Sequence, residues 1–203
     1  MFDSSRYVKS RVLISRLAAI PLGVIVLMSD SRWENHPLCS ALFFGLGCVF
    51  VAISTIGRLW CSLYISGYKA RNLITVGPYS LCRNPLYFFS LCGALGVGLT
   101  TEMLIMAAVI GCIFALYYPA VIRTEEERLL KLHTEDYTIY KERVPRFLPR
   151  NLQMSEPDEY VVNPRIYRKS MIDALWFVWL VGIIELAEGF REAGMLPTLF
   201  TLY

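Results

Sequence analysis

The stretch that decides the fold is residues 84–122, NPLYFFSLCGALGVGLTTEMLIMAAVIGCIFALYYPAVI. Its only charged residue is Glu102, which separates two uncharged apolar runs, Asn84–Thr101 and Met103–Ile122. A helix that crosses a bilayer needs about 20 mostly apolar residues, because every backbone polar group must find its partner inside the helix. The turn at residues 100–102 is very short, so the two runs are predicted to form an antiparallel transmembrane hairpin.

Three other apolar runs extend this pattern. Val12–Met28 is interrupted only by Arg16, and Leu38–Gly57 carries no charge. Ala174–Ile184 is shorter, with eleven uncharged residues between two acidic ones. This length fits either an interfacial helix or a crossing with acidic flanks at the two interfaces, and we predict a crossing. The predicted fold class is all-α, a polytopic membrane helix bundle with four transmembrane helices and a fifth near the C-terminus.

The composition is that of a membrane protein. Hydrophobic residues make up 55% of the 203 residues and charged residues 18%, whereas soluble domains have about 45–50% apolar and about 25% charged residues. The mean hydropathy is +0.45. A disordered chain, a fibrous repeat and an ordinary secreted module are therefore excluded. The six cysteines form no CxxC pair and only two histidines are present, so we predict neither a disulfide nor a metal site.

Lysine and arginine are distributed unevenly along the chain. The first eleven residues carry three, residues 58–83 carry four and residues 123–169 carry ten, whereas the intervening loops hold only Arg32 and Arg191. In membrane proteins the cytoplasmic loops carry this excess. We therefore predict that the N-terminus and both basic segments lie on the cytoplasmic side.

These two basic segments contain the motifs on which chemistry can be built. Residues 76–79 (VGPY) are typical of a turn, and Asn84-Pro85 of a helix start, since proline is tolerated in a first helical turn. Residues 124–143 are predicted as one helix that ends before Pro145, and residues 150–168 as a polar linker. The positions that recur at spacings of three and four along that helix are Leu130, His133, Tyr137, Tyr140 and Val144.

Two features leave alternatives open on composition alone. Glu125, Glu126 and Glu127 are typical of a solvated acidic cluster, but partly desolvated carboxylates at a membrane boundary also suit a cationic ligand. Residues 83–85 fit either an arginine anchored among lipid headgroups or a helix N-terminus that binds a polar ligand.

Two glycine pairs lie inside the predicted spans, Gly45 with Gly47 and Gly96 with Gly98. Neither completes a GxGxxG loop after a strand, so a nucleotide-binding loop is disfavoured. Small residues in transmembrane helices usually permit close packing, and we predict that role here.

Five short motifs occur in order within residues 64–149. They are residues 72–79 (NLITVGPY), residues 83–87 (RNPLY), Glu125-Glu126 with Leu129, Tyr137 with Tyr140, and Val144-Pro145-Arg146 with Pro149. In type, order and spacing they resemble the motifs of the isoprenylcysteine carboxyl methyltransferase family, which belongs with the phospholipid methyltransferases. Members of that family are integral-membrane enzymes that use S-adenosylmethionine.

The resemblance implies an S-adenosylmethionine-dependent methyltransferase with a cytoplasmic cofactor pocket, a lipid or lipid-linked acceptor within the bilayer, and no nucleic-acid partner. The implied cofactor-binding residues are Tyr64, Arg71, Asn72, Leu73, Ile74, Tyr79, Asn84, Pro85, Leu86, Tyr87 and Glu125. We assign Arg123, as a group that can hold an anionic acceptor, and Glu126 as the catalytic residues. The chain is then divided into N-terminal transmembrane helices (residues 1–63), a methyltransferase core (residues 64–149), and a linker with a C-terminal membrane helix (residues 150–203).

Two departures from the family pattern matter. Asn84 stands where histidine is common, and asparagine exchanges hydrogen bonds but cannot titrate. Val121 stands where the eukaryotic enzymes place a substrate-contacting arginine, so the isoprenyl-cysteine substrate does not carry over. The identity of the methyl acceptor is not given by the sequence.

Two other functions remain open. A non-catalytic membrane scaffold or small transporter would make use of the ionisable residues Arg16, Asp173 and Glu185, although an internal repeat is lacking. A membrane reductase resembling the steroid 5α-reductases would bind NADPH in a cytoplasmic pocket.

Overall fold

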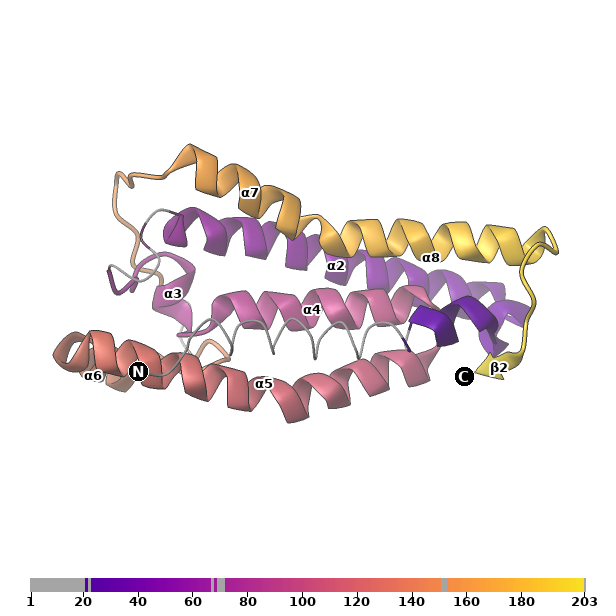
Figure 1. Cartoon of the computed structure of the whole chain (residues 1–203), viewed down its shortest axis with the longest axis horizontal. Helices are drawn as coiled ribbons and strands as arrows, with labels where there is room; N and C mark the ends of the chain where they lie inside the picture. Colours follow the sequence, from indigo (N-terminus) through magenta and orange to yellow (C-terminus); the bar gives the residue numbers. More distant parts are fainter. Residues whose placement is uncertain (1–20, 22, 67, 69–71, 151–152, 203) are drawn as a thin grey trace.

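The computed structural model describes residues 21, 23–66, 68, 72–150 and 153–202, and Figure 1 shows a bundle of helices that run along one long axis. Helices α3 and α6 lie at one end of the bundle, which we call the α6 end. A small two-stranded ribbon lies at the opposite end, which we call the ribbon end (Figure 1). The elements in chain order are β1 (Ser29–Ser31), η1 (Arg32–Asn35), α2 (Pro37–Ile65), α3 (Pro78–Leu81), α4 (Pro85–Thr100), α5 (Leu104–Leu132), α6 (Thr134–Arg143), α7 (Pro164–Ala174), α8 (Trp176–Glu192) and β2 (Phe200–Leu202).

Three helices in the described part of the chain are long and apolar enough to cross a membrane. They are α2, α5 and the continuous stretch Pro164–Glu192 formed by α7 and α8, each of 29 residues. Helix α4 is apolar but has 16 residues, which span about 24 Å, less than the bilayer core of about 30 Å. The predicted run Val12–Met28 lies mostly outside the described residues.

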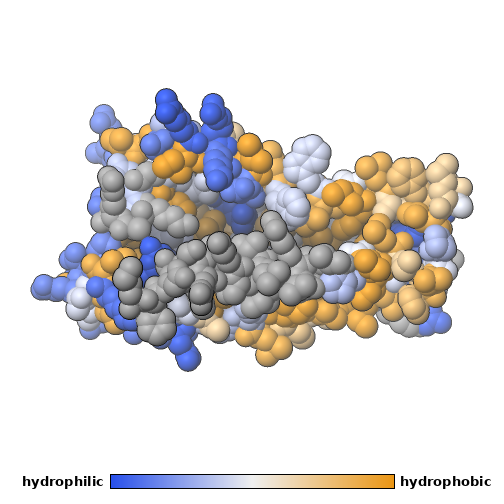
Figure 2. All heavy atoms as spheres, viewed as in Figure 1, coloured by the Kyte–Doolittle hydropathy of each residue, from blue (hydrophilic) through white to orange (hydrophobic). Residues whose placement is uncertain are grey.

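The surface of the long helices is apolar. Leu38, Leu116 and Trp179 are exposed over 82%, 84% and 66% of their surface. Figure 2 shows hydrophilic residues gathered toward the α6 end and hydrophobic residues over much of the rest of this face. In water such exposure would be unfavourable, whereas in lipid it is the expected state.

The predicted hairpin is present. Helices α4 and α5 pack against each other and are joined by only three residues, Thr101–Met103. Glu102 has a φ of 57°, a left-handed conformation that lets the chain reverse direction. The Thr101 hydroxyl donates to the carbonyl of Gly98 at 2.8 Å, which ties the turn to the end of α4.

Helices α2 and α4 approach each other at two glycines. A Cβ on Gly47 would lie 2.7 Å from the carbonyl oxygen of Gly96, and a Cβ on Gly96 would lie 2.8 Å from that of Gly47. Gly98 makes an equally close approach to Ala107 of α5. The predicted packing role is confirmed for these three glycines, but Gly45 has nothing within 4 Å of its Cβ position.

Arg58 provides a polar link between α2, α4 and the junction of α7 with α8. Its guanidinium donates to the Ser90 hydroxyl at 2.6 Å and to the Asp173 carbonyl at 3.2 Å, and it lies over the Phe177 ring at 5.4 Å. These two hydrogen bonds, of which the one to Ser90 is partly buried, link the three helices at one level, since the guanidinium would otherwise be left unpaired in an apolar setting.

Three predictions about the elements need correction. The helix predicted for residues 124–143 is divided: α5 continues to Leu132, His133 interrupts it, and α6 follows. The predicted polar linker 150–168 ends earlier, because α7 begins at Pro164, where the Asn163 side chain caps it by accepting from two backbone N–H groups. As a result, the helix that contains the eleven-residue uncharged run is 29 residues long, Pro164–Glu192.

The all-α prediction also misses one feature. Ser29–Ser31 and Phe200–Leu202 form a two-stranded parallel ribbon. Strands of three residues give almost no alternating pattern, so neither was expected from the sequence. The ribbon joins the segment before α2 to the segment after α8.

The close approach of α2 and α4 predicts a marked difference between two neighbouring glycines. Gly47→Ala is expected to destabilise the protein by about 1–3 kcal/mol, since the added methyl group overlaps the α4 backbone. Gly45→Ala is the matched control on the open face of the same helix and should leave the melting temperature unchanged or slightly raised. Thermal unfolding of detergent-purified protein measures both, and equal melting temperatures for the two variants would contradict this packing.

Candidate functional site

The carboxylate of Glu126, near the α6 end of α5, is bound by three side chains from two other segments. Its Oε1 lies 3.0 Å from Nε of Arg83 and accepts from Nδ2 of Asn84 at 3.2 Å, and its Oε2 lies 3.1 Å from Nε of Arg146. The Arg83 and Glu126 side chains are only 9% and 13% exposed. This is a largely buried ionic network in which each charge has an opposite partner.

Arg83 also holds the segment that follows α6. Its backbone N–H donates to the carbonyl of Pro145 at 2.8 Å, and its guanidinium donates to the carbonyls of Lys141 at 2.9 Å and Val144 at 2.8 Å. Carbonyls at the end of a helix lack intrahelical partners, and a cation there is favourable. One arginine therefore fixes the position of the end of α6 relative to the start of α4.

Asn84 lies in the same network, directly before α4. Besides Glu126, its Nδ2 donates to the carbonyl of Arg146 at 3.0 Å. Both bonds depend on a neutral amide that donates two hydrogens. The Asn84 amide thus links the Glu126 carboxylate to the segment after α6.

A hollow of about 320 Å³ lies beside this network. Small-molecule sites typically occupy about 300–1,000 Å³. The hollow contains both predicted catalytic residues, and most of its lining is charged. The lining residues are Arg83, Arg123, Glu126, Glu127, Leu130, Tyr137, Lys141 and Arg146.

Tyr137 presents a buried hydroxyl at this hollow. The residue is 1% exposed. Arg83 is placed to donate to the phenol oxygen, whereas the hydroxyl hydrogen has no acceptor among the described residues. Burial, aided by the Glu126 carboxylate, raises the pKa of Tyr137 to about 12, although Arg83 and Arg146 act in the opposite direction. The phenol therefore stays protonated at neutral pH and is able to donate a hydrogen bond.

The predicted cofactor-binding residues do not all gather here. Glu125 lies outside the hollow and pairs with Arg128 at 3.6 Å on the surface of α5. Tyr87 contacts the Tyr118 ring at 5.5 Å. Arg71 lies outside the described residues. Pro85 is buried, Asn72 is exposed, and the residues that are half-buried are Leu73, Ile74 and Leu86.

Tyr64 and Tyr79 belong to a second cluster, around the Gly77 turn. Gly77 has a φ of 61°, and a Cβ there would lie 2.4 Å from the Tyr64 ring, so glycine is required on both grounds. The Tyr79 carbonyl accepts from the Tyr140 hydroxyl at 2.7 Å, which connects this cluster to α6. Burial raises the pKa of both Tyr79 and Tyr140.

A segment beyond the predicted core covers this turn. The Gly77 N–H donates to the Ser155 carbonyl at 2.8 Å, and the Ser155 N–H donates to the Ser80 hydroxyl at 3.0 Å. The Tyr64 hydroxyl donates to Glu156, and the Tyr160 hydroxyl donates to the Tyr64 carbonyl at 2.8 Å. Residues 155–160 thus hold the turn in place from outside the motifs.

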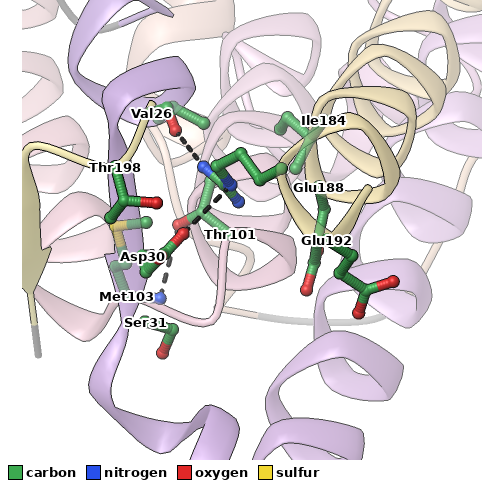
Figure 3. Close-up of a pocket in the computed structure, with 10 residues that line it drawn as sticks. Val26, Asp30, Ser31, Thr101, Met103, Ile184, Glu188, Glu192 and Thr198 are labelled. Atoms are coloured by element: carbon green, nitrogen blue, oxygen red, sulfur yellow. Dashed lines mark hydrogen bonds and ion pairs between the residues drawn. The ribbon is translucent and has the colours of Figure 1, made fainter. Parts of the chain in front are cut away.

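A smaller hollow of about 130 Å³ lies at the ribbon end and is shown in Figure 3. Arg191 links α8 to the segment before α2 there: it pairs with Asp30 at 3.1 Å and donates to the carbonyls of Val26 and Ser29. Glu188 and Glu192 also line this hollow (Figure 3). These contacts hold the end of α8 against β1, so we interpret this hollow as structural.

Six residues that line the larger hollow were not among the predicted site residues, namely Arg83, Glu127, Leu130, Tyr137, Lys141 and Arg146. Arg83, Tyr137 and Arg146 were part of the quoted motifs, so a signal was present. Lys141 carried no such signal, since a lysine on a charged helix face is normally solvated.

The fold and the site define a helical membrane protein with a charged, partly buried site where α4, α5 and α6 meet. Residues 38–136 match the phospholipid methyltransferase family model, and the chain belongs to that family. This confirms the resemblance inferred from the motifs. The match includes Glu126 but ends before Tyr137 and Arg146.

Two relatives match almost the entire chain. It is 39% identical over 194 residues to the cobalt-zinc-cadmium resistance protein CzcN of Cupriavidus metallidurans, covering 96% of this chain and 89% of that protein. It is 36% identical over 194 residues to the nickel-cobalt-cadmium resistance protein NccN of Alcaligenes xylosoxydans xylosoxydans, covering 96% of this chain and 90% of that protein. No solved structure matches the chain.

The two adjacent glutamates are expected to differ in their contribution to stability. Glu126→Gln leaves Arg83 buried without its counter-charge and is expected to cost about 3 kcal/mol. Glu125→Gln breaks only an exposed pair and is expected to cost less than about 1 kcal/mol. Chemical unfolding in detergent measures the two values, and a larger loss for Glu125→Gln would contradict the orientation of α5 described above.

Proposed function

We propose that this protein is an integral-membrane methyltransferase that transfers a methyl group from S-adenosylmethionine to a lipid or lipid-linked acceptor. The observation that carries the proposal is the hollow at the α6 end. Within a chain of this family, it brings Arg83 of the RNPLY motif, Glu126 of the Glu-Glu motif and Arg146 of the Val-Pro-Arg motif into contact.

The chemistry of the hollow fits the cofactor. Its volume of about 320 Å³ is within the range of small-molecule sites. The amino-acid end of S-adenosylmethionine carries both an ammonium and a carboxylate, and the hollow offers carboxylates from Glu126 and Glu127 together with the cations Arg123 and Lys141. When bound, the cofactor supplies an electrophilic methyl group whose bond to sulfur breaks as the bond to the acceptor forms, with the electron pair remaining on sulfur.

The residues of the chain then have to bind, orient and exclude water. Asn84 and Arg83 hold the Glu126 carboxylate in a fixed position, so that it meets a cationic group without rearrangement. Arg123 is exposed at the rim of the hollow and is proposed to attract an anionic acceptor. For the cofactor's cationic group we propose Glu126 in place of Glu125, the residue that the sequence motifs implied, because Glu126 lines the hollow and Glu125 pairs with Arg128 outside it.

We propose that the site lies on the cytoplasmic side, as does the N-terminus, because basic residues from both basic segments gather around the hollow at the α6 end, namely Arg83, Arg123, Lys141 and Arg146. A soluble cofactor would enter from that side. A lipid acceptor would approach laterally, along the apolar surface of α5. The tyrosines Tyr87 and Tyr118, whose rings are in contact at 5.5 Å, lie on the helices between which this path runs.

Both relatives are named for resistance to metals, namely cobalt, zinc, cadmium and nickel, and we propose that the methyl transfer of this protein contributes to such resistance. Within the described residues, no group of three or more His, Cys, Asp or Glu side chains could hold a metal ion, so direct metal binding in that part of the chain is not favoured. Methylation of an anionic lipid group removes negative charge from the membrane surface, which lowers its attraction for divalent cations.

The alternatives are distinguished by the ligand. A reductase of the steroid 5α-reductase kind would bind NADPH, and a scaffold or transporter would bind neither nucleotide. The charged hollow at the α6 end, and the family to which the chain belongs, favour the methyltransferase.

Purified protein is expected to bind S-adenosylmethionine, and membranes that contain it should transfer labelled methyl groups from the cofactor to lipid. Glu126→Gln is expected to weaken cofactor binding at least tenfold, because it removes a charged partner of the cofactor's cationic groups. Glu125→Gln is the matched control, with an expected change of less than twofold. Calorimetry at a temperature at which both variants are folded measures this.

Several results would overturn this proposal or part of it. Binding of NADPH in place of S-adenosylmethionine would establish the reductase, and binding of neither would favour a non-enzymatic role. If only Glu125→Gln weakened binding, the sequence-based assignment would hold and the assignment of Glu126 would be wrong.

The proposed link to metal resistance predicts a dependence on the transfer reaction. Cells that lack this protein are expected to tolerate less cobalt or cadmium, and wild-type protein should restore growth whereas Glu126→Gln should not. Minimal inhibitory concentrations measure this, with protein levels in membranes checked for each variant. Full restoration by a variant that transfers no methyl groups would separate resistance from the reaction.

A further inference from the structure

The Tyr137 hydroxyl is an unmet hydrogen-bonding group in the larger hollow. The residue is 1% exposed and lines the hollow. Arg83 is placed to donate to the phenol oxygen, but among the described residues the hydroxyl hydrogen has no acceptor. A buried polar group without a partner is unfavourable and rare in folded proteins. A protonated phenol in this position is therefore prepared to donate to a ligand that enters the hollow.

The charges around Tyr137 indicate the sign of that ligand. The Glu126 carboxylate is already bound by Arg83 and Arg146. Arg123 and Lys141 also line the hollow, and neither forms an ion pair with another residue in the part of the chain that the structure describes. Against these two cations stands only the carboxylate of Glu127, so the unmatched charge of the hollow is positive.

We infer that Tyr137, Arg123 and Lys141 form an oxyanion-binding subsite that accepts a carboxylate or phosphate group. The Tyr137 hydroxyl donates a hydrogen bond to one oxygen of the anion, and the two cations neutralise its charge. Tyr137 and Lys141 lie one turn apart on α6, while Arg123 lies on α5, so the subsite depends on the break between the two helices at His133.

This chemistry has two possible sources, and assigning the anion to one of them rests on the proposed function. The first is the α-carboxylate of the cofactor's amino-acid end. The second is the phosphate or carboxylate of a lipid acceptor that reaches the same hollow from the bilayer. Both sources present the same group to Tyr137, so the probes must separate them.

The test uses the full chain in detergent with calorimetric titration of three probes. S-adenosylhomocysteine carries the amino-acid carboxylate, its decarboxylated analogue lacks that group, and dihexanoyl phosphatidic acid supplies a lipid phosphate. The variants are Tyr137→Phe and Lys141→Gln. Arg128→Gln is the control, because Arg128 is a cation on the same part of α5 as Arg123 but pairs with Glu125 outside the hollow.

Tyr137→Phe is expected to melt close to the wild-type temperature, because the hydroxyl donates no hydrogen bond in the free protein and only the contact of Arg83 with its oxygen is lost. The same substitution, and Lys141→Gln, should weaken an anionic probe about tenfold, while Arg128→Gln should change it less than twofold. If the two variants bind S-adenosylhomocysteine more weakly than wild type does but bind its decarboxylated analogue equally well, the subsite is assigned to the cofactor. If the variants bind phosphatidic acid more weakly but bind S-adenosylhomocysteine as wild type does, the subsite is assigned to the acceptor.

Other results overturn the subsite. Wild-type binding of neither anionic probe would do so, as would equal binding by wild type and both variants. A large fall in the melting temperature of Tyr137→Phe would show that the hydroxyl has a structural partner. If S-adenosylhomocysteine fails to bind wild type but phosphatidic acid binds through Tyr137, the proposed function fails and the subsite stands.

Discussion

The buried carboxylate of Glu126 is the group on which the arrangement of the α6 end depends. A charge taken out of water must be compensated by partners with good geometry, and Arg83, Asn84 and Arg146 supply them from two segments besides α5. Arg83 in turn donates hydrogen bonds to two carbonyls at the end of α6. The start of α4, the end of α5 and the chain after α6 are thereby fixed relative to one another, and the hollow is the space that this arrangement leaves.

Much of the fold follows from hydrophobic length and small residues. The hairpin of α4 and α5 and the helix at α2 could be predicted, because uncharged runs of this length have few alternatives in a protein. The ends of the elements could not. Helix α5 runs ten residues past Ile122 because Glu, Arg, Leu and Lys are good helix formers and nothing interrupts it before His133. The start of α7 was predicted as part of the linker 150–168, because it is polar. Only α8, which is apolar, had the composition of a membrane span.

The site was predictable as a set of motifs but not as a geometry. Adjacent glutamates in a helix point about 100° apart, so which of Glu125 and Glu126 faces inward depends on the rotation of α5, and that rotation is set by packing with α4. Similarly, Tyr137 faces the hollow only because the break at His133 redirects α6. The bonds from Ser155 to the Gly77 turn connect residues far apart in the chain, and no local pattern encodes such a contact.

The depth of the site follows from the composition of a single helix. The first part of α5, from Leu104 to Ile122, is uncharged, and the part from Arg123 onward carries charges of both signs. Because the helix is continuous through this change, embedding its apolar part in lipid necessarily holds Arg123 and Glu126 at the membrane boundary. A polar ligand from water and an acceptor with an apolar tail can meet at such a boundary at the lowest cost. Anywhere else, either the polar ligand would have to enter lipid or the apolar tail would have to enter water. The hollow therefore lies at the one depth that both of the proposed ligands, which dissolve in different solvents, can reach.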